Sequence, residues 1–335
     1  MTRQQLLALC EAAGAKPVHA EKLLAYIFRR GVNDPDQIPD LPDSFRRFLK
    51  EHSQPLSVVI KAEQQAKDGT RKLLLTMPDG KNIETVLIPG AGRLTQCIST
   101  QVGCAIGCKF CLTATVGLTR NLSAAEMVAQ VQTAQGLSAN KVRNLVLMGM
   151  GEPLHNFDEV AQFIRIAADP LGMAFSPRRI TLSTAGLVPG IYRMIEENLP
   201  CSLAVSLNAT TDEIRSRIMP INRRYPIVEL LQAIRDYIAA HGKKRVLIEY
   251  VLLAGVNDSG EDAHRLCKLL KDIDSTVNLL PFNASPGSKF QAPADENVSR
   301  FFSILCEAGF VAVVRKSRGQ DISAACGQLK AEQTA

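Results

Sequence analysis

The feature that most constrains the fold is an alternation of strand-like and helix-like segments that begins near residue 90. Short apolar runs rich in branched side chains predict strands, and amphipathic segments with helical periodicity lie between them. A pattern of strand, crossover helix and strand is typical of parallel β-α units. The predicted strands are 94–100, 144–149, 178–184, 202–208, 245–253, 277–283 and 311–316, and the predicted helices are 121–136, 156–169, 227–242, 261–273 and 296–309. About six units fit this length, so we expect an α/β fold with a full or partial barrel.

The first 90 residues have a different character. Residues 1–55 contain short amphipathic stretches joined by turns rich in Pro and Asp, which predict a small helical accessory domain. Residues 56–90 have the pattern of strands, with turn signals at Asp68-Gly69 and Asp79-Gly80, and predict a connecting β segment. The remaining residues, 91–335, would then form the main α/β core and its C-terminal segment.

Composition narrows the class of protein. The sequence has no secretory signal and no apolar run near the ~18 residues of a membrane span, so we expect a cytoplasmic protein without membrane contact. In a reducing compartment, the nine cysteines predict metal ligands or catalytic thiols, not structural disulfides. The net charge of +6 is compatible with a nucleic-acid partner but does not establish one.

Three of the cysteines form one motif. Cys104, Cys108 and Cys111 have the spacing C-x3-C-x2-C, and Phe110 precedes the last of them. Three thiolates can hold three irons of a [4Fe–4S] cluster and leave the fourth iron open to the amino and carboxylate groups of S-adenosylmethionine. The residues alone also allow a zinc site or reactive thiols, although zinc would require a fourth ligand and the motif contains no histidine.

The stretch QCISTQVGCAIGCKFCLTATVGLTRNLSAAEMVAQV resembles the signature of the radical S-adenosylmethionine superfamily, and most closely its RNA adenine methyltransferases. The similarity continues through MGMGEPLHN, SLNATTDEIRSRIMPINRRYPI, IEYVLLAGVND and RGQDISAACGQL, and covers roughly residues 84–329. It implies a partial (βα)6 radical-SAM barrel. It also implies two cofactors, S-adenosylmethionine and a [4Fe–4S] cluster bound by the three cysteines of the motif.

The resemblance further implies which residues bind S-adenosylmethionine. They are Gly151, Glu152, Ser183, Ser206, Leu207, Asn208 and Asn283. By themselves, Gly151 and Glu152 are explained equally well as part of a glycine-rich turn, and the other residues are more often satisfied polar groups at strand ends. Asn208 stands where the family commonly has histidine. Both side chains can donate a hydrogen bond, so we expect the contact to persist.

Three further residues are implied to be catalytic: Glu84, Cys97 and Cys326. Cys326 would take a methyl group from one S-adenosylmethionine, and the radical formed from a second would abstract hydrogen from that methyl. The resulting carbon radical would add to adenine, Glu84 would act as the base, and Cys97 would release the product by forming a disulfide with Cys326. Without the resemblance, Glu84 would be a solvated strand charge and both cysteines buried apolar residues. Cys10, Cys201, Cys267 and Cys306 are expected to be of that kind.

The implied reaction is methylation of adenine C2 in 23S rRNA, at adenosine 2503, and in tRNA, at adenosine 37. A C8-methylating enzyme of the antibiotic-resistance branch is the alternative, but that branch tends to have Ala after Glu152 where this chain has Pro153. A non-catalytic iron–sulfur or zinc RNA-binding module would leave Cys97 and Cys326 unexplained. We expect a one-electron reductase such as flavodoxin as partner, and a monomer.

Basic residues gather on segments between the predicted elements. They are Arg178, Arg179, Arg215, Arg217, Arg223, Arg224, Lys243, Lys244, Arg245, Arg315, Lys316 and Arg318. Phosphate contacts by such residues would give salt-dependent affinity for RNA. The segment RSRIMPINRRYP is the strongest candidate for an RNA-contacting loop. The helical accessory domain is expected to help hold the RNA.

Overall fold

Ten strands form one mixed sheet in the order β1-β2-β3-β4-β7-β8-β9-β10-β11-β12. The computed structural model describes residues 1–53, 56, 58–90, 92–138, 140–242, 245–284 and 287–331. Every pairing from β4 to β12 is parallel. These strands are β4 (Arg93–Cys97), β7 (Val142–Leu147), β8 (Ile180–Thr184), β9 (Ser202–Ser206), β10 (Val246–Leu252), β11 (Ser275–Pro281) and β12 (Val311–Val314). Within the described residues β1 and β12 are the two edges of the sheet, so the barrel is partial.

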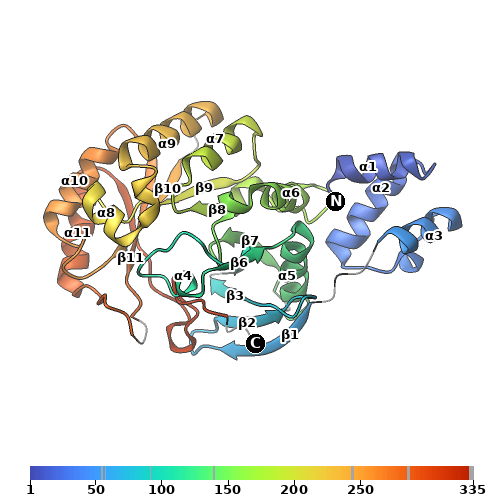
Figure 1. The fold of residues 1–335 in the computed structure, drawn as a ribbon, viewed down its shortest axis with the longest axis horizontal. Coiled ribbons are helices and arrows are strands. Elements are labelled where there is room, and N and C mark those ends of the chain that lie inside the picture. Colours follow the sequence, from blue (N-terminus) through green and yellow to red (C-terminus); the bar gives the residue numbers. More distant parts are fainter. Residues whose placement is uncertain are drawn as a thin grey trace.

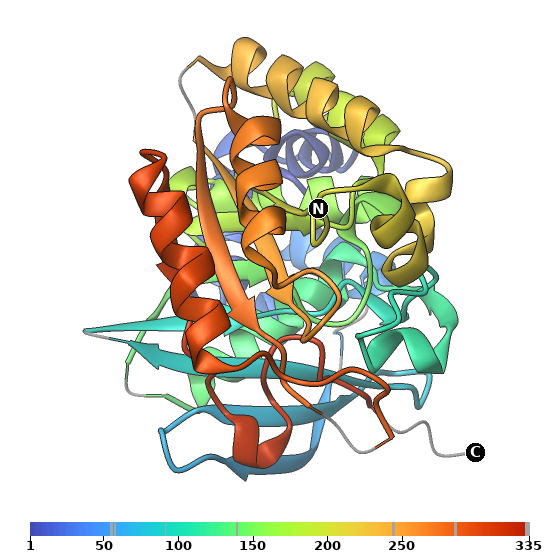
Figure 2. The ribbon, with the colours of Figure 1, turned by 90° about the vertical axis from the view of Figure 1, so that its left-hand side faces the viewer.

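Helices connect the parallel strands and cover the outer face of the sheet (Figures 1 and 2). They are α5 (Ala124–Gly136), α6 (Phe157–Ala168), α7 (Val188–Glu196), α8 (Asp212–Ile218), α9 (Ile227–His241), α10 (Gly260–Leu270) and α11 (Asp295–Glu307). Their apolar faces bury residues such as Phe163, Leu230 and Phe301 against the strands. The expected six β-α units are confirmed, and β12 adds a seventh parallel strand after the last helix.

Three antiparallel strands extend the sheet beyond β4. They are β1 (Val59–Gln65), β2 (Arg71–Thr76) and β3 (Asn82–Gly90), and β3 pairs with β4. The two predicted turns are confirmed, with Gly69 and Gly80 at φ of +82° and +78°. Residues of β2 and β3 such as Leu73 and Ile83 share one apolar core with the barrel strands.

The N-terminal helices form a unit with its own small apolar core (Figure 1). The unit contains α1 (Arg3–Ala12), α2 (Pro17–Leu23), a π-helical turn (Leu24–Arg29), a 3-10 turn (Pro35–Gln37) and α3 (Asp43–His52). Arg3 joins it to the barrel through two hydrogen bonds to the Asp169 carboxylate, of 2.9 and 2.7 Å. Gln132 of α5 donates a 2.6 Å hydrogen bond to the carbonyl of Ile27.

The C-terminal segment returns from β12 to the antiparallel strands, beside which it lies in both views (Figures 1 and 2). It contains a 3-10 turn, Gln320–Ile322. The backbone N–H of Gly319 donates to the Asp68 carboxylate (3.0 Å), and the hydroxyl of Thr113 donates to the carbonyl of Leu329 (2.7 Å). These contacts hold the segment against both the β1–β2 turn and the loop that carries the cysteine motif.

The remaining elements are short. They are β5 (Gln101–Gly103), α4 (Thr113–Val116), β6 (Leu118–Asn121) and the 3-10 turns Pro153–Asn156, Pro177–Arg179 and Pro220–Arg223. None of the helices in the described part of the chain combines the length and the apolar character that crossing a membrane requires.

Candidate active site

The cysteine motif lies in a loop closed by a small hairpin. The sequence predicted one strand over 94–100, but β4 ends at Cys97, and β5 pairs with β6 in a separate two-stranded sheet. The loop closes at Gly103, where φ is +82° and a Cβ would lie 1.7 Å from the carbonyl oxygen of Gly117. Only glycine fits this position, because any side chain would collide with the backbone across the neck of the loop.

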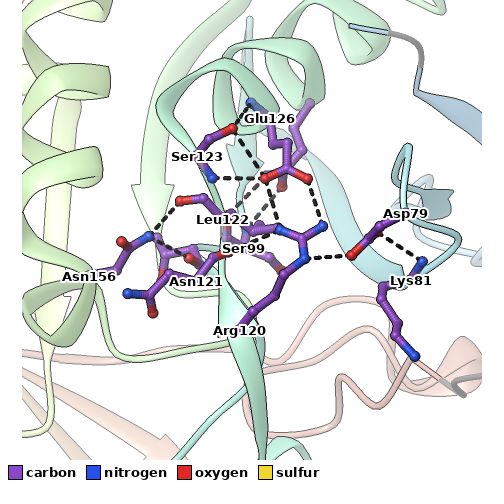
Figure 3. A network of polar contacts seen from close by, with 11 residues as sticks. Asp79, Lys81, Ser99, Arg120, Asn121, Leu122, Ser123, Glu126 and Asn156 are labelled. Carbon is purple, nitrogen blue, oxygen red and sulfur yellow. Dashed lines mark hydrogen bonds and ion pairs between the residues drawn. The ribbon is translucent and has the colours of Figure 1, made fainter.

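A polar network anchors the base of this loop to the barrel (Figure 3). Arg120 of β6 donates to Asp79 in the β2–β3 turn (2.6 Å) and to both carboxylate oxygens of Glu126 (3.0 and 2.8 Å). Glu126 completes the capping box of α5 with Ser123. Asn156 donates to the carbonyls of Thr100 and Leu122, one on each side of the hairpin (2.9 and 2.7 Å). The network therefore joins three parts of the fold to the arms of the motif loop.

The three thiols of the motif line one wall of a cavity at the carboxyl ends of the parallel strands. Burial raises the pKa of Cys104 to about 12 and raises that of Cys108 as well. Within the described residues, no group of three or more histidine, cysteine or carboxylate side chains is arranged as a metal site. The donor set itself, three thiols with no other donor in the motif, fits iron–sulfur chemistry, and metal binding would have to displace their protons.

Gly151 and Glu152 follow β7 and line the same cavity. At Gly151, φ is +108°, and a Cβ would lie 2.7 Å from the Cβ of Gln101. The Glu152 carboxylate accepts hydrogen bonds from the backbone N–H groups of Leu154 (3.1 Å) and Ala185 (2.7 Å). Burial raises the pKa of Glu152 to about 7, and these hydrogen bonds act in the opposite direction.

The ends of β8, β9 and β11 supply the other predicted cofactor-binding residues. Ser183, Ser206, Asn208 and Asn283 line the cavity. The side chain of Leu207 does not, because it is fully buried in the core. Asn208 has a φ of +57°, and its amide oxygen accepts from the backbone N–H of Val251 (2.8 Å). Within the described part of the chain, its amide nitrogen meets only the weakly accepting sulfur of Met219, at 3.2 Å, and remains a good donor for a ligand.

A second cavity adjoins the first and contains the two thiols expected to be catalytic. Cys97, at the end of β4, and Cys326, in the C-terminal segment, both line it, and Cys326 also lines the first cavity. Burial raises the pKa of Cys97 to about 12, and Cys326 contributes to the rise. Cys326 is accessible from the cavities, but the protein atoms around it raise the pKa of its thiol, and Arg315 lowers it.

Glu84, the expected base, lines neither cavity. It lies on β3 with 5% of its surface exposed, and its carboxylate pairs with Lys72 at 3.0 Å. The other carboxylate oxygen accepts a hydrogen bond from the backbone N–H of Lys330 (2.7 Å). The structure therefore brings Glu84 into contact with the C-terminal segment that carries Cys326.

One basic residue of the predicted RNA-contacting loop is not available to RNA. Arg215 is fully buried in α8 and donates to the carbonyls of Leu207 (2.9 Å), Ala185 (2.7 Å) and Ser206 (3.2 Å). The prediction was wrong here because charge does not reveal which side of an amphipathic helix a residue occupies. Arg217, Arg223 and Arg224 are exposed. Arg215 instead ties together the strand ends that form the cavity.

Other predictions have mixed outcomes. Cys10 and Cys201 are buried and Cys267 is half-buried, but Cys306 is exposed on α11, so its expected burial was wrong. Lys243 and Lys244 lie outside the described residues.

Sequence reasoning missed the part that Arg215 plays, and it missed Glu249 entirely. The signal for Glu249 was a carboxylate in the apolar strand VLIEYVLL, where burial of a charge is costly.

Comparisons with known proteins agree with this arrangement. The family model of the radical SAM superfamily matches residues 98–267. A dual-specificity RNA methyltransferase RlmN from Syntrophotalea carbinolica is 47% identical over 334 residues, which cover 99% of this chain and 89% of that protein. The RlmN of Geobacter sulfurreducens is 48% identical over 317 residues, covering 95% and 87%.

A solved structure shares the whole fold. The crystal structure of a radical SAM methyltransferase from Sphaerobacter thermophilus is 44% identical and has a TM-score of 0.89, covering 99% of this chain and 98% of that one. This similarity extends over the accessory helices, the antiparallel strands and the partial barrel together. The chain thus belongs to the radical SAM superfamily and, within it, to the family of dual-specificity RNA methyltransferases called RlmN.

Proposed function

We propose that the protein methylates C2 of adenine in 23S rRNA, at adenosine 2503, and in tRNA, at adenosine 37, and consumes two S-adenosylmethionine molecules per methyl group. One observation carries most of the proposal. Two free thiols on segments far apart in the sequence, Cys97 and Cys326, line one cavity that adjoins the cavity of the cysteine motif. A simple RNA-binding module would have no use for this pair.

Cys104, Cys108 and Cys111 would hold a [4Fe–4S] cluster. Glu152 is suited to accept the cofactor's ammonium, and Gly151 lets the backbone approach. The rest of the cofactor would be bound by the side chains of Ser183, Ser206, Asn208 and Asn283 and by the backbone of Leu207. When bound, the cluster and S-adenosylmethionine would together supply a carbon radical by one-electron cleavage of the sulfonium.

Cys326 would carry the methyl carbon to the base. As a thiolate it would attack the methyl carbon of S-adenosylmethionine, forming the S–CH3 bond as the S+–CH3 bond breaks and S-adenosylhomocysteine leaves. Its position at the junction of the two cavities supports this role, because it lines both the cavity that we assign to the cofactor and the second cavity, which we assign to the nucleotide. Arg315 lines the second cavity too, and its positive charge favours the thiolate of Cys326.

Cys97 would release the product. Its sulfur would attack the Cys326 sulfur, forming a disulfide and breaking the bond that links the protein to the RNA, and external thiols would then reduce the disulfide. Glu84 would take the proton from the ring carbon. The carboxylate of Glu84 forms an ion pair with Lys72 and accepts a hydrogen bond from the backbone N–H of Lys330. This role therefore requires the C-terminal segment to shift when the adenine is bound.

Basic side chains at the mouth of the second cavity are suited to RNA phosphates. Arg315, Lys316 and Arg318 line it, and Arg217, Arg223 and Arg224 are exposed after β9. The target base would have to leave its stack to reach the thiols. We infer that the N-terminal helical unit adds RNA contacts. We also propose that a flavodoxin-type reductase supplies the electron, that the protein acts in the cytoplasm and that it is a monomer.

The second candidate is methylation at C8 by the same chemistry. Gly151-Glu152-Pro153 favours the C2 branch, because the C8 branch tends to have Ala after Glu. The test is to incubate anaerobic, cluster-reconstituted protein with S-adenosylmethionine, a one-electron reductant and unmodified 23S rRNA fragment or tRNA. We expect 2-methyladenosine in the digested RNA. 8-Methyladenosine would move the protein to the other branch, and release of 5′-deoxyadenosine without any methylated adenosine would remove the assigned substrate.

A variant separates the two thiols. Cys97→Ala should still methylate Cys326 but fail to release the product, so a covalent protein–RNA adduct should accumulate and be visible by mass spectrometry. Cys306→Ala, which removes an exposed thiol from α11, is the matched control and should turn over normally. Normal turnover by Cys97→Ala would exclude its role in release.

A further inference from the structure

Glu249 is a buried carboxylate in the wall of the first cavity. It lies in the middle of β10 with 6% of its surface exposed, and it lines the cavity together with Val251 two residues later. In the register of the sheet it lies opposite Ser206 of β9 and Asn278 of β11. Its neighbour Ser206 is a residue that the resemblance assigns to S-adenosylmethionine.

Only one of the two carboxylate oxygens of Glu249 has a partner in the protein. Oε1 accepts a hydrogen bond from the side-chain amide of Asn278 (3.0 Å), whereas Oε2 is buried and has no hydrogen-bond partner among the described residues. Of the buried side-chain atoms in this condition, Oε2 alone belongs to a residue that lines this cavity. Buried polar atoms are nearly always satisfied, so a donor from a ligand is expected here.

The position of Glu249 indicates which part of the cofactor supplies the donor. Glu152 follows β7 beside Cys104 and Cys108, whose pKa values its charge raises, so the amino acid end of the cofactor belongs there. Glu249 is on β10, with β8 and β9 between it and β7. It also lies close enough to Cys326 to affect that thiol. The cofactor carbon that must reach residue 326 is attached to the ribose, so the ribose hydroxyls are the donors nearest Glu249.

We propose that Glu249 is a cofactor-binding residue whose free carboxylate oxygen accepts a hydrogen bond from a ribose hydroxyl of S-adenosylmethionine. The inference rests on the cofactor assigned under the proposed function. Asn278 holds the carboxylate through Oε1 and leaves Oε2 as the oxygen available to a ligand in the cavity that Glu249 lines. Burial raises the pKa of Glu249, while the positive charge of Arg315 and the Asn278 hydrogen bond lower it and favour the charged, accepting form.

Binding of a cofactor product tests the proposal without turnover or RNA. Cluster-loaded protein is titrated anaerobically by calorimetry with S-adenosylhomocysteine and with its 2′-deoxy and 3′-deoxy analogues. We expect the wild type to bind at least one deoxy analogue about 10- to 100-fold more weakly, the typical loss of a hydrogen bond to a charged group. Glu249→Ala should bind S-adenosylhomocysteine more weakly by a similar factor and should no longer distinguish it from the analogues.

Two further variants control for folding and for charge. Glu229→Ala removes an exposed carboxylate from α9 and should bind all three compounds like the wild type. Glu249→Gln keeps the side-chain volume and an acceptor for Asn278 but puts an amide nitrogen in place of the free oxygen. It should fold, retain its iron and still lose at least half of the wild-type preference for the ribose hydroxyl, measured as the ratio of the two dissociation constants.

Three results would overturn the inference. They are equal affinity of the wild type for all three compounds, an unchanged penalty for the missing hydroxyl in Glu249→Ala, and, if that variant does not fold, an unchanged penalty in Glu249→Gln. Because the titration contains no RNA, a methyl group placed at C8 or on another RNA would leave these affinities unaltered. A wild type that binds no S-adenosylhomocysteine would instead overturn the cofactor assignment itself.

Discussion

The backbone N–H of Lys330 donates a hydrogen bond to Glu84 Oε2 at a distance of 2.7 Å. Lys330 lies four residues after Cys326, so a residue on β3 fixes the segment that carries the thiol proposed to accept the methyl group. The second carboxylate oxygen of Glu84 pairs with Lys72 of β2 at 3.0 Å, with both side chains largely buried. Glu84 therefore has a structural task in addition to the chemical one proposed for it.

Glu84→Gln separates these two tasks. The amide oxygen can still accept the hydrogen bond of Lys330, but the side chain can no longer take a proton. Methylation should fall by about 100-fold or more, the usual contribution of a positioned base, and a covalent protein–RNA adduct should accumulate. The lost pair with Lys72 should cost about 1–3 kcal/mol in the free energy of unfolding. Product formation within fivefold of the wild type would show that Glu84 serves only to hold the segment.

Burial of Cys97 predicts how its reactivity depends on pH. A thiol with a pKa of about 12 is almost fully protonated at pH 8, so iodoacetamide should alkylate Cys97 more than about 100-fold more slowly than an unperturbed thiol. Because only the thiolate reacts, the rate of alkylation should rise with pH, by about tenfold per pH unit from pH 7 to 9.5. Pulsed alkylation and peptide mass spectrometry measure this, with exposed Cys306 as internal reference. A rate that levels off below pH 9 would contradict the prediction.

The Arg120 network predicts a coupling between stability and the motif loop (Figure 3). Arg120→Gln leaves Glu126, whose side chain is 7% exposed, without its cation. We expect a loss of about 2–4 kcal/mol in the free energy of unfolding by urea and a lower iron content after reconstitution. Arg245→Gln breaks the half-exposed pair with Asp274 and should cost less than about 1 kcal/mol. Equal costs for the two variants would mean that the network does not anchor the loop.

Local patterns in the sequence were enough to predict most elements. The alternation of apolar runs and amphipathic helices predicted the parallel strands, and Asp68-Gly69 and Asp79-Gly80 predicted the turns between β1, β2 and β3. Properties that depend on tertiary packing could not be predicted from the sequence. Nothing near Glu84 in the sequence indicates that Lys330 occupies its carboxylate, because the two residues are 246 positions apart. The strand over 94–100 was predicted too long because the hairpin of β5 and β6 depends on the contact between Gly103 and Gly117.

Arg215 shows the same limit. As one of several arginines in RSRIMPINRRYP it was expected on the surface, yet it is fully buried, and burial lowers its pKa to about 10. Its guanidinium satisfies the carbonyls of Ala185, Ser206 and Leu207, which lie where β8 and β9 meet the cavity.

Arg215→Gln cannot reach all three carbonyls, and each unsatisfied one costs about 1–3 kcal/mol. We expect the free energy of unfolding to fall by about 3–5 kcal/mol. Affinity for S-adenosylhomocysteine should fall by more than about tenfold even in the folded fraction, because Ser206 loses its support. Arg217→Gln, two residues later on the exposed side of α8, should change neither quantity but should weaken RNA binding at low salt. If Arg215→Gln instead weakened RNA binding and left cofactor affinity intact, Arg215 would be the RNA contact that its sequence context suggested.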